Sequence, residues 1–264
     1  MKNLLKFEFR KLFQMKTLYI FSGILVAFLV FTVGTYKMMD VLMQETGIMA
    51  ETGMDISMFG LSSFSGKDFL VSALYNSEIT IALAVVISLL LCTDYSSGTI
   101  KNIVAKGYSR AEIFFSKFLA AITVTVIFTV ICWISGFILG TAFWKNPGDG
   151  WEISIFYNLF AQLILMIVYC SMFCLLASLI KKTGGVITLS IVIPIAMDLI
   201  IQIIDLFINS ENFSLGDYWF QSYITKLSNT AVSTDTITYG LIAAVLYIAV
   251  FTGLNILVTR KSEV

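Results

Sequence analysis

Six long runs of apolar residues, separated by polar segments, dominate the chain. They cover residues 18–36, 77–93, 118–143, 153–180, 185–208 and 237–258. A helix needs about 20 residues, at a rise of about 1.5 Å each, to cross a hydrocarbon core of about 30 Å. Each run reaches this length, although the second does so only when its polar flanks are included. Within each run the apolar residues are continuous and do not alternate with polar residues. The pattern therefore predicts an all-α integral membrane protein with six transmembrane helices, not an outer-membrane barrel.

The composition narrows the chemistry that the chain can carry. Hydrophobic residues make up 58% and charged residues only 13% of the sequence, whereas soluble domains have about 25% charged residues. There is no histidine, which excludes His-based acid–base catalysis and His metal sites. All four cysteines fall in apolar runs, where buried thiols usually serve as small packing residues. We therefore expect no catalytic residue, metal or cofactor in this chain.

The basic residues are distributed unevenly between the two sides of the predicted membrane. With the N-terminus inside, 13 Lys and Arg residues fall in inner segments and four in outer segments. The positive-inside rule then predicts a multi-pass protein of the cytoplasmic membrane with both termini in the cytoplasm. The first run is too long for the apolar region of a signal peptide, so we expect it to stay in the membrane.

Two outer segments are substantial, residues 37–76 and 209–236. Six methionines crowd into positions 38–58. Thioethers can bind Cu(I), but they also form adaptable apolar surfaces. Because no Cys or His lies near them, the second interpretation is favoured.

Residues 1–17 have the pattern of an amphipathic helix that lies in the headgroup region. Its apolar positions recur with helical spacing, and cations fill much of the rest. These apolar positions are Leu5, Phe9, Leu12 and Phe13. The helix is either a simple anchor or also a contact for a cytoplasmic partner, in which case Phe9, Arg10 and Phe13 are the candidate interface residues.

The inner segment 94–117 is the most informative stretch between two predicted spans. Ser109 followed by Glu112 forms a capping box, so a helix is predicted to begin at Arg110. No helix breaker occurs from there to residue 143, a length of about 51 Å at helical rise. This exceeds the hydrocarbon core by several turns, so the third spanning helix should project into the cytoplasm.

A short helix is predicted just before it, opened by Gly98 and Thr99. Ile100, Ile103 and Val104 share one side of this helix, and basic residues lie elsewhere. Held below the bilayer, such a helix is suited to dock into a groove on another protein.

These residues resemble a known family. Asp94-x-x-x-Gly98-Thr99, followed by Ser109-Arg110 and Lys117, is similar to the pattern of ABC-2 type permeases, the membrane-spanning subunits of ABC transporters. Six spans with both termini inside also match that family. At position 107 this chain has Gly where many relatives carry Pro.

The resemblance implies a coupling helix in segment 94–117 that contacts an ATPase subunit together with the N-terminal helix. The implied coupling residues are Asp94, Gly98, Thr99, Lys101, Ser109, Arg110, Glu112 and Lys117. It also implies a second permease copy or a homologous permease, and export of an amphiphilic compound such as an antibiotic or peptide. ATP and Mg²⁺ would be bound by the partner. The chain's own nearest approach to a phosphate loop, Gly60–Lys67, has the wrong glycine spacing and is followed by Asp68 instead of Ser or Thr.

The fifth predicted span carries a polar stripe that includes Asp198. The stripe, at helical steps of four and three, contains Pro194, Asp198, Gln202, Asp205 and Asn209. A charged residue at mid-membrane costs about 2.5–3.5 kcal/mol on insertion scales, and no Lys or Arg lies deep in a span to pair with it. We expect Pro194, Asp198, Gln202 and Asp205 to line a water-filled cavity or subunit interface, or else to make structural polar contacts. An ATP-independent channel or carrier with Asp198 as ion or proton site is the alternative function.

The third predicted span has a small-residue face. Gly136-x-x-x-Gly140, extended by Cys132, permits close contact with another helix. Packing within one subunit and dimerisation explain this face equally well.

Overall fold

The computed structural model describes residues 1–46, 65–75, 78–208 and 214–261. Over these ranges the chain is helical and contains no strand. Six helices are long and apolar enough to span a membrane, which confirms the predicted number. They are α2 (Lys16–Thr46), α5 (Glu78–Ser96), α7 (Arg110–Trp144), α8 (Ile153–Ile180), α9 (Thr183–Ile208) and α11 (Thr234–Lys261).

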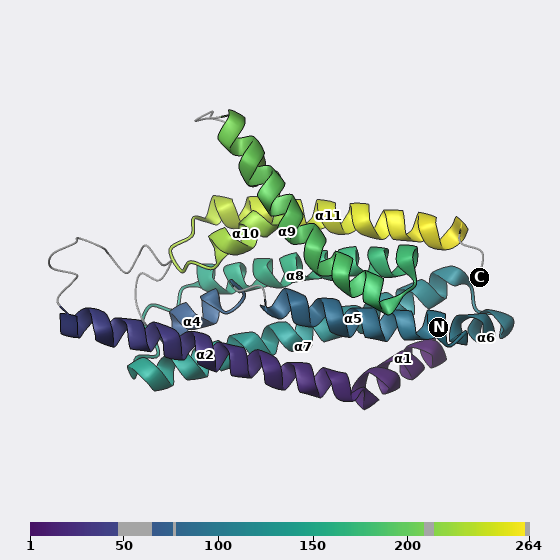
Figure 1. Ribbon diagram of the computed structural model, residues 1–264, viewed down its shortest axis with the longest axis horizontal. Helices are drawn as coiled ribbons and strands as arrows, with labels where there is room; N and C mark the ends of the chain where they lie inside the picture. The colour runs from purple at the N-terminus through teal and green to yellow at the C-terminus, as the bar shows by residue number, and fades with distance from the viewer. Residues whose placement is uncertain (47–64, 76–77, 209–213, 262–264) are drawn as a thin grey trace.

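Shorter helices gather at the two ends of this bundle. α1 (Lys2–Gln14) and α6 (Thr99–Ala105) lie at the end where α11 finishes, on the right of Figure 1. α4 (Gly66–Ser72), the 3₁₀ helix η2 (Leu215–Tyr218) and α10 (Phe220–Leu227) belong to the two segments expected on the outer side. We call the end of the bundle that contains α1 and α6 the α6 end. It comprises α1, α6, the start of α7 and the last turns of α5, α8 and α11.

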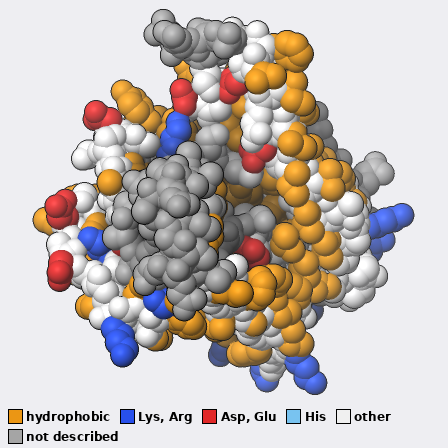
Figure 2. All heavy atoms as spheres, turned by 60° about the vertical axis from the view of Figure 1, so that its left-hand side comes forward, with side chains coloured by type: hydrophobic (Ala, Val, Ile, Leu, Met, Phe, Trp, Pro, Cys, Tyr) orange, Lys and Arg blue, Asp and Glu red, His pale blue; other side chains and the backbone are white. Residues whose placement is uncertain are grey.

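The core lies between α5, α7 and α8, whose facing side chains exclude solvent almost completely. Leu83, Ile87, Phe128 and Phe173 are fully buried there. By contrast, α9 and α11 turn many large apolar side chains outward, and Figure 2 shows a broad area of hydrophobic side chains on one flank. A surface of this kind is stable against lipid and not against water, which agrees with a multi-pass membrane protein.

The long helix α7 begins where the capping box predicted. The Ser109 hydroxyl accepts from the Glu112 backbone N–H (3.2 Å), and the Glu112 carboxylate accepts from the Ser109 N–H (3.0 Å). α7 then runs for 35 residues, about 52 Å at helical rise. The expectation of one helix much longer than the bilayer is therefore confirmed.

The described parts of the expected outer segment 37–76, residues 37–46 and 65–75, are largely helical. α2 continues to Thr46, and α4 packs along α7 with Phe69 and Val71 buried. Residues 47–58 of the methionine-rich stretch lie outside the described residues, as do residues 59–64.

The small-residue face of α7 is occupied by α4 of the same chain. A Cβ on Gly136 would lie 2.6 Å from the Phe69 carbonyl oxygen, and a Cβ on Gly140 would lie 2.9 Å from the Phe69 Cβ. Only glycine lets the two backbones approach this closely. Packing within one subunit thus accounts for this motif.

The described part of the expected outer segment 209–236, residues 214–236, also folds onto the bundle. Phe220 and Leu227 of α10 are fully buried. The Leu227 carbonyl accepts from the side-chain amides of Asn158 (2.9 Å) and Gln162 (2.8 Å) on α8. Buried amides on a spanning helix therefore find their partners on a segment that lies between spans.

Candidate functional site at the α6 end

Four charged side chains from three helices form a buried ion network at the α6 end. The Lys117 amine of α7 lies 2.9 Å from a Glu8 carboxylate oxygen of α1 and also contacts Asp94 of α5. The Lys11 amine of α1 lies 2.6 Å from the other Asp94 oxygen. Glu8, Asp94 and Lys117 are buried, and Lys11 is partly exposed. We call these four residues the ion network.

The ion network is neutral as a whole, which is what its burial requires. Two carboxylates face two amines, so no charge is left without an opposite charge at contact distance. Lys11 donates further to the Leu90 carbonyl (2.9 Å) near the C-terminal end of α5, where the helix dipole favours a cation. The network thus ties α1 to the ends of two spanning helices.

Apolar contacts complete the same junction. On α1, Leu4, Glu8 and Leu12 recur every four residues and are buried, so they form one stripe facing the bundle. Leu4 packs with Ile103 of α6 and Ile113 of α7. α1, α6 and α7 are therefore joined into one unit by polar and apolar contacts together.

The backbone geometry of α6 explains which of its sides remains outward. Gly98 has a positive φ of 68°, a conformation that glycine adopts without strain, and it turns the chain out of α5 into α6. Ile100 and Ile103 are buried against the chain itself, while Lys101 and Lys106 are exposed. The side of α6 that is left for a partner is therefore polar and basic.

Five of the eight predicted coupling residues fall into two groups. Asp94 and Lys117 belong to the ion network, inside the protein. Lys101, Ser109 and Arg110 are exposed.

The remaining predicted residues of this end have mainly local contacts. Thr99 exchanges a hydrogen bond with the Ser97 hydroxyl (2.7 Å). Glu112 caps α7 and lies 3.9 Å from the N-terminal amine. On α1, Arg10 and Phe13 are exposed and Phe9 is half-buried against the core.

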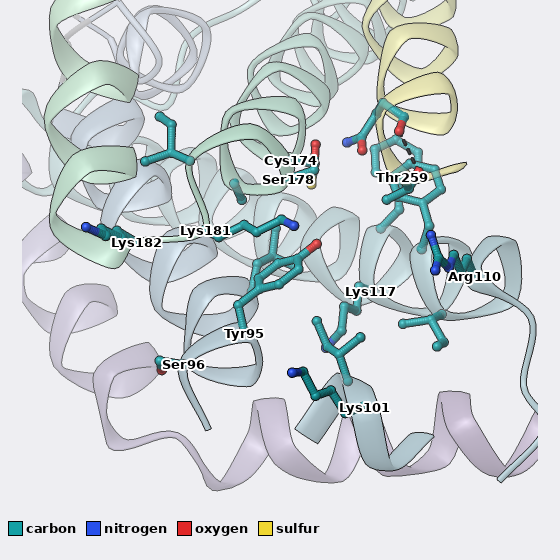
Figure 3. Close-up of a pocket in the computed structure, with 18 of the residues that line it drawn as sticks. Tyr95, Ser96, Lys101, Arg110, Lys117, Cys174, Ser178, Lys181, Lys182 and Thr259 are labelled. Atoms are coloured by element: carbon teal, nitrogen blue, oxygen red, sulfur yellow. Dashed lines mark hydrogen bonds between the residues drawn. The ribbon is translucent and has the colours of Figure 1, made fainter. Parts of the chain in front are cut away.

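A cavity of about 420 Å³ opens beside the ion network, between α5, α6, α7, α8 and α11. Figure 3 shows Tyr95 and Lys181 side by side in it, with the Lys181 amine 5.9 Å from the Tyr95 ring centroid. Lys101 and Arg110 also line it, whereas Lys182 points away. Most of the other lining side chains are apolar. The cavity therefore combines apolar walls with a basic rim.

The predicted polar stripe of α9 lies far from this end and has its own partners. Asp198 accepts from the Trp219 indole N–H (2.7 Å) and from the Gln221 amide. Asp205 accepts from the Ser214 hydroxyl (2.7 Å) and from two backbone N–H groups of η2. Of the other members, Pro194 is buried and Gln202 is exposed. These contacts favour the structural interpretation of the stripe, because both carboxylates hold the segment 214–221 against α9.

Comparison with known families decides where the chain belongs. The model of DUF2705, described as a protein of unknown function, matches residues 39–264, which is most of the chain. The protein belongs to the DUF2705 family. No curated protein matches it.

The region matched by the DUF2705 model includes Asp94 and Lys117 but begins after α1. Two members of the ion network, Glu8 and Lys11, therefore lie outside the matched region. The sequence analysis missed both of them, because it selected the apolar positions of this helix and Arg10 and gave no role to Glu8 or Lys11. One signal was present: Glu8 lies one helical turn from both Leu4 and Leu12, in the middle of an apolar stripe.

Proposed function

We propose that this chain is the membrane-spanning permease subunit of an ATP-driven ABC transporter, with ATP hydrolysis in a separate subunit. The single observation that carries the proposal is the unit formed by α1, α6 and the start of α7. The buried ion network ties α1 to the ends of the spanning helices α5 and α7, and apolar contacts join α6 to α1 and α7. A rigid unit of this kind, placed at one end of a helical bundle, is suited to receive a mechanical input.

The proposed path of force starts on the outward side of α6. A partner that closes on ATP pushes against Lys101 and Arg110, which lie on the exposed side of the unit. Because α6 packs against α1 and α7, the push moves them together. α7 continues as one helix for 35 residues, so a displacement at Arg110 is carried along the whole span.

The orientation follows from the distribution of positive charge. The proposal places the α6 end and both termini in the cytoplasm, in the cytoplasmic membrane, in agreement with the positive-inside rule. α1 lies along the membrane surface there, with Phe7 and Phe13 about half exposed toward lipid or the ATPase. A second copy or a homologous permease completes the pathway. The cargo is an amphiphilic compound such as an antibiotic or a peptide, moved outward.

The test of this proposal is charge reversal at Arg110. An Arg–carboxylate contact is roughly twice as strong as a neutral hydrogen bond, so Arg110→Glu should repel an acidic partner surface. The expected result is normal membrane insertion, with the ATPase subunit lost on co-purification or with ATP hydrolysis uncoupled from transport. The measurements are pull-down of the proposed ATPase subunit, its ATPase activity and export of the cargo.

The matched control is Lys145→Glu. Lys145 is also exposed and follows the other end of the same helix, so it undergoes the same charge change away from the proposed interface. Binding and transport at wild-type levels in both variants would remove Arg110 from the interface. A neighbouring gene with no Walker A lysine would count against the whole proposal.

The alternative function, an ATP-independent channel or carrier, makes Asp198 the ion or proton site. Asp198 is half-buried and accepts hydrogen bonds from Trp219 and Gln221. This arrangement supports a structural role better than a conducting one, so the transporter subunit remains our proposal.

A further inference from the structure

The cavity at the α6 end shares Lys101, Arg110 and Lys117 with the features described above, but neither the ion network nor the proposed coupling role uses its interior. Its volume of about 420 Å³ falls in the range of about 300–1,000 Å³ that is typical of ligand sites. Its walls include Leu91, Phe114, Phe118 and Ala177. An apolar space of this size, opening among helix ends, is suited to part of an amphiphilic molecule.

The charge at the cavity is of one sign. Its described lining residues include five Lys and Arg side chains and no Asp or Glu. Lys117 is neutralised by its two carboxylate partners in the ion network, and Lys182 points away in Figure 3. Lys181 lies over the Tyr95 ring, a contact that leaves its amine able to bind an anion as well. The cavity therefore favours an anionic ligand.

A second, independent observation points to a ligand with hydroxyl groups. Asn255 of α11 lines the cavity and is only 1% exposed, and its Oδ1 has no hydrogen-bond partner among the described residues. A buried acceptor of this kind costs stability unless something donates to it. The neighbouring Thr259 hydroxyl is turned to the Asn255 backbone carbonyl (2.5 Å) and does not supply the donor.

The position of the cavity favours a lipid headgroup over a soluble molecule as the ligand. It lies where α5, α8 and α11 end, at the boundary between an apolar bundle and water. Leu179 lies between the lining residues Ser178 and Ile180 and is more than half exposed, so lipid-facing surface adjoins its rim. A headgroup inside the cavity can therefore keep its acyl chains on the outside of the bundle.

We infer that this cavity binds the headgroup of an anionic phospholipid that carries hydroxyl groups, of the phosphatidylglycerol type. The phosphate lies against Lys181 and Lys101, and a glycerol hydroxyl donates to Asn255 Oδ1. The acyl chains follow the apolar walls toward Leu179. This inference does not rest on the proposed transport function, since it concerns the isolated chain and its bilayer.

The experiment is lipid binding to the purified protein in detergent, followed by native mass spectrometry and thermal unfolding. Phosphatidylglycerol should be retained and should raise the unfolding temperature, whereas phosphatidylcholine and free glycerol phosphate should do neither. Lys181→Gln and Asn255→Leu should each weaken phosphatidylglycerol retention about 10-fold, the effect of losing one hydrogen bond that involves a charged group or a buried acceptor. Lys181→Arg should retain the lipid, which distinguishes loss of charge from loss of folding.

The control is Lys226→Gln, a change at an exposed lysine on α10, away from the α6 end. It should bind lipid like the wild type. Equal retention of the two phospholipids, or wild-type retention by both Lys181→Gln and Asn255→Leu, would overturn the inference. Binding of free glycerol phosphate as tight as that of the lipid would also overturn it, because the acyl chains would then contribute nothing.

Discussion

Removing one charge from the ion network should destabilise the protein far more than removing a surface charge. Lys117 and Glu8 are both buried and 2.9 Å apart, which corresponds to about 6 kcal/mol of gross attraction at an effective dielectric constant of about 20. The desolvation of both groups offsets much of this attraction. Lys117→Met leaves Glu8 buried with no cation at contact distance in the network. We expect a loss of about 3–5 kcal/mol in the free energy of unfolding.

The second half of this prediction is a double-mutant cycle. In Glu8→Met/Lys117→Met both charges are gone, and Asp94 keeps its contact with Lys11, so the network is neutral again. Replacement of a whole buried pair by apolar side chains is often close to neutral. The double variant should therefore be at least about 2 kcal/mol more stable than Lys117→Met alone.

The assay is denaturant or thermal unfolding in detergent, combined with limited trypsin cleavage in α1. Trypsin should cut α1 faster in Lys117→Met, because that helix loses its attachment to α7, and slower again in the double variant. Lys226→Met is the matched control, since its pair with Asp217 (2.6 Å) is exposed and exposed pairs contribute about 0.2–1 kcal/mol. If Lys117→Met costs no more than this control, or if the two single changes simply add, the network does not hold α1 in place.

Three further predictions concern other parts of the fold. Asp198→Ala should lower the free energy of unfolding by about 1.5–3 kcal/mol, because Trp219 and Gln221 lose the acceptor of their hydrogen bonds. It should also shift the fluorescence of the Trp219 indole. An unchanged melting curve and emission spectrum would contradict this prediction. Gly136→Ala should destabilise the protein, because the added Cβ would lie 2.6 Å from a carbonyl oxygen of α4. In Gly23→Ala the added Cβ meets nothing within 4 Å, so this variant should stabilise α2 by about 0.5–1 kcal/mol. Equal melting temperatures of the two variants would refute the close packing of α4 on α7. Asp149 and Lys101 are exposed, and the native cysteines are buried. In the variant Asp149→Cys the thiol should react with an impermeant reagent from outside, and in Lys101→Cys it should react only from inside. The opposite labelling would reverse the proposed orientation.

The features that the sequence analysis predicted correctly are those set by local chemistry. The apolar runs identify spanning helices because length and hydrophobicity along one segment decide that outcome. Ser109 and Glu112 are three residues apart, and both hydrogen bonds of the capping box depend on nothing outside that turn. The start of α7 at Arg110 follows from these bonds.

The pairing within the ion network could not be predicted in the same way. Glu8 and Lys117 are separated by 109 positions, and only the packing of α1 against α7 brings them together. The predicted apolar face of α1 was Leu5, Phe9, Leu12 and Phe13, but the buried stripe is Leu4, Glu8 and Leu12. On the buried face Leu4 packs with Ile103 and Ile113, and Glu8 pairs with Lys117, all residues far away in the chain.

The partners of the polar residues in the spans, toward the opposite end of the molecule, could not be predicted from the sequence either. No Lys or Arg lies deep in a predicted span to pair with Asp198, so the sequence left open a water-filled cavity or a contact with another helix. Its donors are Trp219 and Gln221, which belong to a segment expected to be an outer loop. The short helices between the spans thus satisfy polar groups that would be costly in lipid. The Leu227 carbonyl of α10 accepts a hydrogen bond from the buried amide of Gln162 in the same way. A substitution in these connecting segments should therefore alter hydrogen bonding inside the bundle as well as at its surface.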